Sequence, residues 1–475
     1  MSSRPIKNNK INLPQRSFPK TSRLNHSEDI DKLGVSTTNR QIIKLAAPIS
    51  LALLIPQLSF FTNTVFLGRL GLRELGVNGI TGVFYLILSM IGYGLSSGIQ
   101  IQMARRAGEE DKKGLAQLLT NGAMLSVLFS LGLMMLTLWF VPILFGFSLH
   151  DNDNLSLSVN YVYIRVWGLP FLMIAQLFNS FFISIDRSRM LIYGSIVATA
   201  LNILFDYLLI FGKLGLPAMG FNGAAVASVI AEVFYCLTMV GMFFYHKLYN
   251  TYPVFNFIHF DFELSQRTLK VASPLIVQFM FSIGGWLVFF IFIEHLGAQS
   301  LAASQVLRNI FGIVGVGTWA LATACNTMVS NLIGQGRQRE VMRIIAKICK
   351  LSLLYAVIVC ALLLAFSREF LSIYSDDLAL ISFALPSLRV IVIATLIMSL
   401  STVVFNGVVG TGNTLVNLTM EITCVGSYLL YCYFIISQWH SPLYICWGSE
   451  FIYWTTLLTA SGLYLKSGRW KGKSI

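Results

Sequence analysis

Charged residues are scarce in this sequence of 475 residues. Only 12% of them are Asp, Glu, Lys or Arg, about half of the roughly 25% found in ordinary soluble domains. Such a chain cannot cover itself with polar surface on all sides, and its mean hydropathy of +0.70 agrees. The same composition excludes collagen-like and disordered chains. We therefore expect an integral membrane protein, and an all-α one, because open strand edges cannot satisfy their hydrogen bonds in lipid.

Cysteine and histidine are few, and their spacing does not suit catalysis or metal binding. The seven cysteines all fall inside apolar stretches without a CxxC pair, which argues against zinc knuckles and extracellular disulfides. The six histidines lie near segment ends or in loops, so we find no buried cluster for a membrane enzyme. We predict a protein that is not an enzyme and has no cofactor. The histidines are His26, His150, His246, His259, His295 and His440.

Long apolar runs are what the sequence has in quantity. We count twelve, each long enough to cross about 30 Å of hydrocarbon at about 1.5 Å per residue. The polar, basic residues before them have no short apolar core with a cleavage site, so they are not a signal peptide. The runs are 42–67, 77–104, 115–145, 157–184, 189–211, 220–246, 264–293, 300–333, 338–366, 378–408, 413–436 and 441–465.

Lysine and arginine are distributed unevenly between the segments that join these runs. With the N-terminus inside, the cytoplasmic segments hold 27 of the 34 basic residues and the outer segments only 4. Because basic loops stay on the cytoplasmic side, we expect a multi-pass protein of the cell (inner) membrane with both termini cytoplasmic. The net charge of +13 then reflects this topology and not a nucleic-acid partner.

The two halves of the sequence resemble each other. An offset of 226 residues aligns the first three apolar runs with the seventh to ninth without a gap. Each half has six runs, an even number, so both halves enter from the same side and are related by an axis along the membrane normal. We predict two parallel-repeat six-helix lobes around a central cleft, an arrangement suited to alternating access. The matches include Ala46/Ala272, Pro48/Pro274, Leu70/Leu296, Gly71/Gly297 and Gly108/Gly334.

These patterns set the predicted boundaries. A cytoplasmic polar tail is followed by an N-terminal lobe, a cytoplasmic linker, a C-terminal lobe and a basic tail. The five parts cover 1–40, 41–246, 247–263, 264–466 and 467–475.

Several motifs in this order resemble the multidrug and toxic compound extrusion (MATE) family. They are Gln57 to Thr64 with Leu67 to Gly71, Ala200 to Gly212, Gly220 to Ser228, Leu296-Gly297 with Ala302-Ala303, and Gly407 to Asn413. The resemblance covers about residues 40 to 466. It implies an antiporter that exports small, often cationic and amphipathic drugs or toxins in exchange for H⁺ or Na⁺. The wider multidrug/oligosaccharidyl-lipid/polysaccharide flippase superfamily keeps a second reading open, a flippase for a lipid-linked glycan.

Buried polar residues in the first half are candidates for ion coupling. Asp206 lies about six residues inside the fifth run, and an acid within a membrane span is a functional candidate by default. Asn202, four residues earlier, shares its face, and Asn63 and Ser228 bring oxygen atoms to a similar depth. The resemblance implies a cation site of this kind, with Asp206, Asn202 and Ser228 at matching positions. The family usually has Asp where this chain has Asn63, which leaves H⁺ and Na⁺ both open.

Other polar and aromatic residues are candidates for further roles. Glu232, four residues after Ser228, is either a second proton carrier or, with its repeat partner Glu450, a structural residue. The role of Glu421 stays open, and the family's acids in the seventh and tenth helices are replaced here by Ser282 and Ser399. We expect Arg165 and Arg389 to extend toward water at the outer ends of their helices. Candidates for the substrate cavity are Phe60, Phe61, Trp286, Arg308 and Trp319, and Arg308 has Glu294 as an alternative partner.

Two prolines mark a possible bend in the first helix. Pro48 and Pro56 each remove a backbone hydrogen bond, so bending there would move Asn63 relative to Asp206. We expect small-molecule substrates and membrane lipids as partners, a monomeric protein, and no bound metal beyond a coupling Na⁺.

Overall fold

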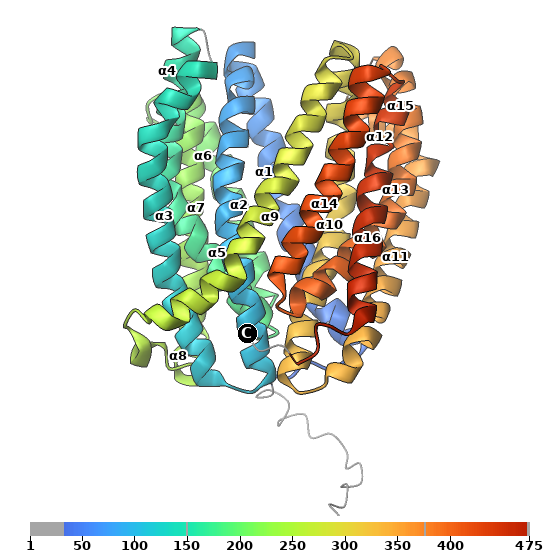
Figure 1. Ribbon diagram of the computed structural model, residues 1–475. Helices are drawn as coiled ribbons and strands as arrows, with labels where there is room; N and C mark the ends of the chain where they lie inside the picture. The colour runs from blue at the N-terminus through green and yellow to red at the C-terminus, as the bar shows by residue number, and fades with distance from the viewer. Residues whose placement is uncertain (1–32, 149–150, 375–376, 473–475) are drawn as a thin grey trace, which may run out of the picture. The chain divides into compact units, whose positions relative to one another are not determined.

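The computed structural model describes residues 33–148, 151–374 and 377–472, which form a bundle of long helices (Figure 1). Most of the predicted tail 1–40 and the last residues of the tail 467–475 lie outside these ranges. The helices are α1 (Asn39–Leu70), α2 (Leu72–Gly108), α3 (Lys112–Ser148), α4 (Asn152–Arg165), α5 (Leu169–Ser184), α6 (Met190–Phe211), α7 (Phe221–Tyr245), α8 (Leu248–Thr251), α9 (Phe262–Glu294), α10 (Ala298–Gly334), α11 (Val341–Ala365), α12 (Ser367–Ser372), α13 (Leu378–Gly410), α14 (Thr414–Cys432), α15 (Leu443–Cys446) and α16 (Ser449–Ser467).

The predicted all-helical membrane fold is confirmed over the described residues. Eleven helices there are long and apolar enough to span a membrane, with α4 and α5 counted as one span because a single 3₁₀ turn joins them. Each predicted run corresponds to one of these spans, apart from the twelfth. That run contains α15 and α16, and α16 is a less apolar helix of 19 residues that packs against α13 and α14.

Local chemistry fixes where several helices begin. Thr38 caps α1 by accepting a hydrogen bond from the backbone N–H of Gln41, and Asp261 caps α9 through the N–H of Leu264. A side-chain oxygen at this position satisfies a backbone donor that the first turn leaves free. The caps place the start of α9 at the end of the predicted linker 247–263, which otherwise holds α8 and a 3₁₀ turn.

The internal repeat reappears in the helix boundaries and in the packing. α2 and α10 each contain 37 residues, and they begin 226 residues apart. α6 packs along α1 in the N-terminal half (α1–α7), and α14 packs along α9 in the same way in the C-terminal half (α9–α16). In Figure 1 the oblique yellow helix α9 passes from the N-terminal half toward the C-terminal half.

The two halves touch mainly through α1, α2, α9 and α10, and their glycines approach the opposite half toward one end of these helices. We call this the basic end; it is formed by the connections 109–111, 246–261 and 335–340. Gly94 and Gly98 of α2 approach the backbone of α9 there, and Tyr93 of α2 contacts Phe279 with ring centroids 5.1 Å apart. Toward the opposite end, which we call the far end, a Cβ at Gly79 or Gly284 would meet nothing within 4 Å.

A pair of repeat-related glycines forms the tightest contact between the halves. A Cβ on Gly108 would lie 2.0 Å from the carbonyl oxygen of Asn331, and one on Gly334 would lie 2.1 Å from that of Arg105. The four residues exchange places under the 226-residue offset, so the contact has two-fold symmetry. Neither glycine can gain a side chain unless the ends of α2 and α10 separate.

We expect Gly108→Val to favour separation of the halves at the basic end. Overpacking of this kind costs about 1 to 3 kcal/mol, so labelling of a cysteine placed at the buried seam residue Ser330 should become about tenfold faster or more. Gly132→Val is the matched control, because a Cβ at Gly132 of α3 meets nothing within 4 Å. Equal labelling in the two variants would contradict the role of this contact.

The segment before α1 bridges both halves at the basic end. The backbone N–H groups of Leu33 and Gly34 donate to Glu110 after α2, at 3.0 and 3.1 Å. The N–H of Val35 donates to Asn331 of α10 at 3.0 Å, and Lys347 of α11 donates to the Thr37 carbonyl at 2.7 Å. This short segment therefore contacts both halves, and its hydrogen bonds help to hold the two halves together at the basic end.

Candidate functional site

The residues predicted for ion coupling come together where α1, α6 and α7 meet. Asn63 of α1 donates from Nδ2 to Oδ2 of Asp206 at 3.2 Å, and Asn202 donates from Nδ2 to the hydroxyl of Ser228 at 3.4 Å. We call Asn63, Asn202, Asp206 and Ser228, together with Ser59, the coupling cluster. Ser59 was not predicted; its hydroxyl donates to Oδ1 of Asn202. Its position four residues before Asn63, on the same face of α1, was the signal in the sequence.

Asp206 is the only acid of the coupling cluster, and it is fully buried, with 0% of its surface exposed. Its Oδ2 atom has Asn63 as partner, whereas Oδ1 has no hydrogen-bond partner within the described structure. A buried carboxylate whose oxygens are incompletely paired is costly. The arrangement therefore favours occupation by a proton or a cation, which would complete the partners of Oδ1.

Glu232 has a different environment, which the sequence left open. Arg165 donates to both of its carboxylate oxygens at 2.7 Å, and Tyr85 donates to them at 2.9 and 3.1 Å. The Arg165 guanidinium also lies 3.8 Å from the centre of the Tyr85 ring. Gly168 makes room for the pair, because a Cβ there would lie 1.9 Å from Oε2 of Glu232. Our expectation that Arg165 extends toward water is wrong. Its guanidinium instead pairs with the buried carboxylate of Glu232.

The repeat partners of this ion pair are arranged differently. Glu450 is 1% exposed and accepts a hydrogen bond from Nε1 of Trp454 at 2.8 Å, while Arg389 is exposed. The sequence left two roles open for Glu232, a second proton carrier or a structural role shared with Glu450, and the two acids do not have equivalent partners. One buried acid is neutralised by arginine, and the other has no ion-pair partner in the described ranges.

The aromatic residues predicted to line a cavity differ in their surroundings. Phe60 and Phe61 are both 59% exposed on α1, and Trp319 is partly exposed on α10. Trp286 lies in an aromatic group of the C-terminal half, 5.9 Å from Phe290 and 6.2 Å from Trp447 between ring centroids.

Arg308 of α10 is half-buried. Its guanidinium lies 5.2 Å from the Phe290 ring. Within the described chain it forms no ion pair with Glu294, which is exposed, so that suggested pairing is not found.

The two candidate hinge prolines lie inside α1, which runs unbroken from Asn39 to Leu70. Pro48 is buried and Pro56 is exposed. α9 carries Pro274 at the position equivalent to Pro48, whereas Ser282 stands at the position equivalent to Pro56. α1, the helix that contains both prolines, therefore also carries Asn63 of the coupling cluster.

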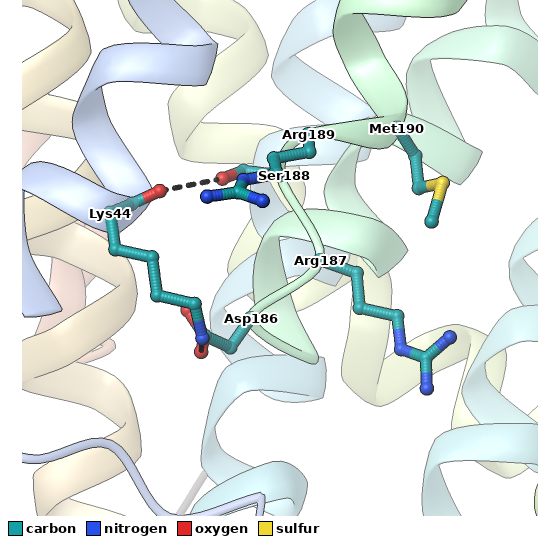
Figure 2. Close-up of a pocket in the computed structure, with 6 residues that line it drawn as sticks. All are labelled: Lys44, Asp186, Arg187, Ser188, Arg189 and Met190. Atoms are coloured by element: carbon teal, nitrogen blue, oxygen red, sulfur yellow. Dashed lines mark hydrogen bonds and ion pairs between the residues drawn. The ribbon is translucent and has the colours of Figure 1, made fainter. Parts of the chain in front are cut away.

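A hollow of about 240 Å³ opens at the basic end, between the start of α1 and the turn from α5 to α6 (Figure 2). Lys44 reaches across it to Asp186 at 2.5 Å, and the Ser188 hydroxyl donates to the carbonyl of Leu45 at 3.1 Å. Its lining residues are Lys44, Asp186, Arg187, Ser188, Arg189 and Met190. These contacts tie α1 to the α5–α6 turn, and the hollow includes none of the residues predicted for the cavity.

Taken together, these features describe a helical membrane protein with two related halves and buried acids. The chain has many helices long and apolar enough to cross a membrane. They form two related halves, and acids are buried inside the spans. No group of three or more His, Cys, Asp and Glu side chains suited to hold a metal occurs among the described residues.

Comparison with known proteins gives the family. The MatE family model matches residues 48–208 and 274–434, one stretch in each half, and the chain belongs to this family of transporters. It is 27% identical over 350 residues to a probable multidrug resistance protein NorM of Synechocystis sp., covering 73% of this chain and 75% of that one. It is 22% identical to a probable NorM of Thermotoga maritima, with 94% and 96% covered.

A solved structure shares the fold. A MOP superfamily transporter from Pyrococcus furiosus superposes with a TM-score of 0.82 at 16% sequence identity, over 94% of this chain and 98% of that one. The family match confirms the resemblance seen in the sequence motifs, and it is to a family of transporters, not of enzymes. The solved structure confirms the all-helical fold.

Proposed function

We propose that this protein is a cation-coupled antiporter that exports small, often cationic and amphipathic compounds by alternating access. The observation that carries the proposal is Asp206, a fully buried carboxylate at the junction of three helices, one of whose oxygens has no hydrogen-bond partner among the described residues. Exchange of a proton or Na⁺ at this carboxylate changes the charge of the site. Such a change can couple an ion gradient to a movement of the halves.

The contacts between the halves support alternating access. They lie toward the basic end, at the symmetric contact of Gly108 and Gly334 with the opposite backbone, while α2 and α9 carry uncrowded glycines toward the far end. Opening requires these contacts to break and others to form at the far end. Because α1 contacts both α10 and α6, its movement would link the basic end to the coupling cluster.

The substrate class follows from the relatives and from exposed aromatic rings. The curated relatives are named multidrug resistance proteins. In this chain Phe60, Phe61 and Trp319 present exposed rings, and planar cations bind to the faces of such rings. A set of exposed rings without a fixed array of polar partners suits several related compounds better than one.

We further propose that the basic end faces the cytoplasm of a cell (inner) membrane. A single cysteine at Asn152, which is exposed at the start of α4 on the far end, should react with an impermeant maleimide on intact cells. A cysteine at Gln338, between α10 and α11, should react only after permeabilisation, because positive loops stay inside. The reverse pattern would show the opposite orientation.

Transport by purified protein in liposomes tests the function directly. Ethidium movement is followed by fluorescence while a proton gradient or a sodium gradient is imposed, each without the other. We expect one of the two gradients to drive ethidium against its own concentration gradient. Movement that responds to neither gradient would contradict antiport, and transfer of a lipid-linked glycan instead would favour the flippase.

A further inference from the structure

A second buried carboxyl lies in the C-terminal half, outside the coupling cluster. Glu421 of α14 is 1% exposed. Its Oε1 atom accepts a hydrogen bond from the hydroxyl of Tyr453 of α16 at 2.7 Å and contacts the hydroxyl of Ser282 of α9. Three helices therefore meet around one carboxyl oxygen.

No basic side chain neutralises Glu421 in the part of the chain that the structure describes. α9 carries no charged residue between Lys270 and Glu294, so the nearest lie twelve residues from Ser282, about 18 Å along the helix. α14 has no other charged residue. On α16, Tyr453 contacts the rings of Tyr428 and Trp454, and Glu450 accepts a hydrogen bond from Trp454. Lys466 lies in the last turn of α16. Arg389 of α13 is exposed, and Cys424, three residues after Glu421 on α14, is buried.

The repeat places this carboxyl at the seam equivalent to that of the coupling cluster. α14 lies along α9 as α6 lies along α1, where Asn63 meets Asp206. Ser282 occupies the position of α9 that corresponds to Pro56 of α1. In each half, a carboxyl is therefore hydrogen-bonded to a polar side chain of the first helix of that half. The two carboxyls lie at different positions along their helices.

The hydrogen bonds of Ser282 accommodate both charge states of Glu421. A serine hydroxyl has one proton to donate. Its oxygen lies 3.2 Å from the backbone carbonyl of Gln278 and also contacts Glu421. If Ser282 donates to Gln278, a protonated Glu421 can donate to the serine oxygen. If Glu421 is ionised, Ser282 can turn and donate to it instead.

The geometry favours a proton over a metal cation. A hard cation needs a shell of several oxygens around it. Here the two hydroxyls contact the carboxyl oxygen directly at hydrogen-bond distance, which leaves no space for an ion between them. An ionised carboxylate so placed is costly in a membrane-spanning helix, and binding a proton removes that cost.

Unpaired oxygen atoms continue along the same seam toward the basic end. Gln278 and Asn417 each lie four residues before Ser282 and Glu421, on the same faces of α9 and α14. Gln278 is 5% exposed and Asn417 is 0% exposed, and their side-chain oxygens have no hydrogen-bond partner in the described structure. Such acceptors can hold a proton donor between the carboxyl and the basic end.

We propose that Glu421, with Ser282 and Tyr453, is a proton-binding site in the C-terminal half, separate from Asp206. The proton forms an O–H bond with the carboxyl of Glu421, and its release leaves the carboxylate held by the two hydroxyls. Motion of α9 relative to α14 changes the Ser282 contact and therefore the retention of the proton. This proposal depends on the contacts around Glu421 and not on which ion Asp206 exchanges.

Infrared difference spectroscopy on the purified full-length protein tests this site. Spectra recorded at two pH values show a band from each carboxyl group that gains or loses a proton. The Asp206→Asn background removes the contribution of the coupling cluster. In this background we expect a protonated-carboxyl band that Glu421→Gln abolishes and that Glu450→Gln, the matched buried acid, leaves in place.

Ser282→Ala gives a second measurement that does not depend on the folding of the Glu421 variant. It should keep the amplitude of the band but shift its frequency, because the carboxyl loses a hydrogen-bond partner. Difference spectra that are the same with and without Glu421→Gln, or a band assigned to this site that vanishes only in Glu450→Gln, would overturn the proposal. A band that disappears on addition of NaCl at constant pH would also overturn it, since the ligand would then be Na⁺. Failure of ethidium transport with the band retained would contradict only the proposed antiport.

Discussion

Asp206→Asn is expected to abolish gradient-driven transport while the protein still folds. Asparagine keeps the size of the side chain and can still bond to Asn63, but it cannot bind and release a proton or neutralise Na⁺. Without a change of charge at the coupling cluster, ion occupancy cannot bias the halves toward one arrangement. Ethidium accumulation against its gradient in proteoliposomes should fall by about 100-fold or more, to the rate of liposomes without protein.

Two control variants make this result specific. Asp153→Asn removes an exposed acid of α4 whose side chain is 81% exposed, and it should transport normally. Asn63→Asp adds a second carboxylate beside Asp206 and should strengthen cation binding, because two charges attract a cation more strongly than one. If Asp206→Asn, expressed at normal levels, still moved ethidium uphill, the assignment of coupling to Asp206 would be wrong.

Glu232→Gln should destabilise the protein far more than Glu450→Gln. The first change leaves Arg165, whose side chain is 14% exposed, with no ionised partner. Breaking a buried ion pair in this way costs about 3 to 5 kcal/mol. The second replaces a carboxyl that lacks an ion-pair partner, and the amide oxygen can still accept from Trp454, so the loss should be about 1 kcal/mol or less. Thermal unfolding in detergent, followed by tryptophan fluorescence, compares the two.

Arg165→Met with Glu232→Gln provides the control for this difference. Removing both charges should restore part of the stability that either single change costs, because no unpaired charge then remains. Equal unfolding temperatures for Glu232→Gln and Glu450→Gln would mean that the two acids are structural equivalents after all.

The residues of the coupling cluster were predictable because they follow simple rules of spacing and depth. Asn202 and Asp206 are four residues apart and therefore share a face of α6. Asn63 and Ser228 were placed at similar depth by counting from helix ends. Ser59 was missed, although the same four-residue spacing relates it to Asn63. The direction of Arg165 could not be predicted, because it depends on Glu232 from a helix that is distant in sequence.

The sequence by itself determined the membrane class, the helical spans, the repeat and the family. These features depend on local or periodic properties: apolar length, the absence of charge, and residues matched at a constant offset. The tertiary structure alone decided which buried charges are neutralised. Across the described ranges, Glu232 pairs with Arg165, whereas the donors to Glu421 and Glu450 are hydroxyl and indole groups. Pairing across helices depends on how the helices rotate and approach one another, and the repeat in sequence does not oblige both halves to pair their charges alike.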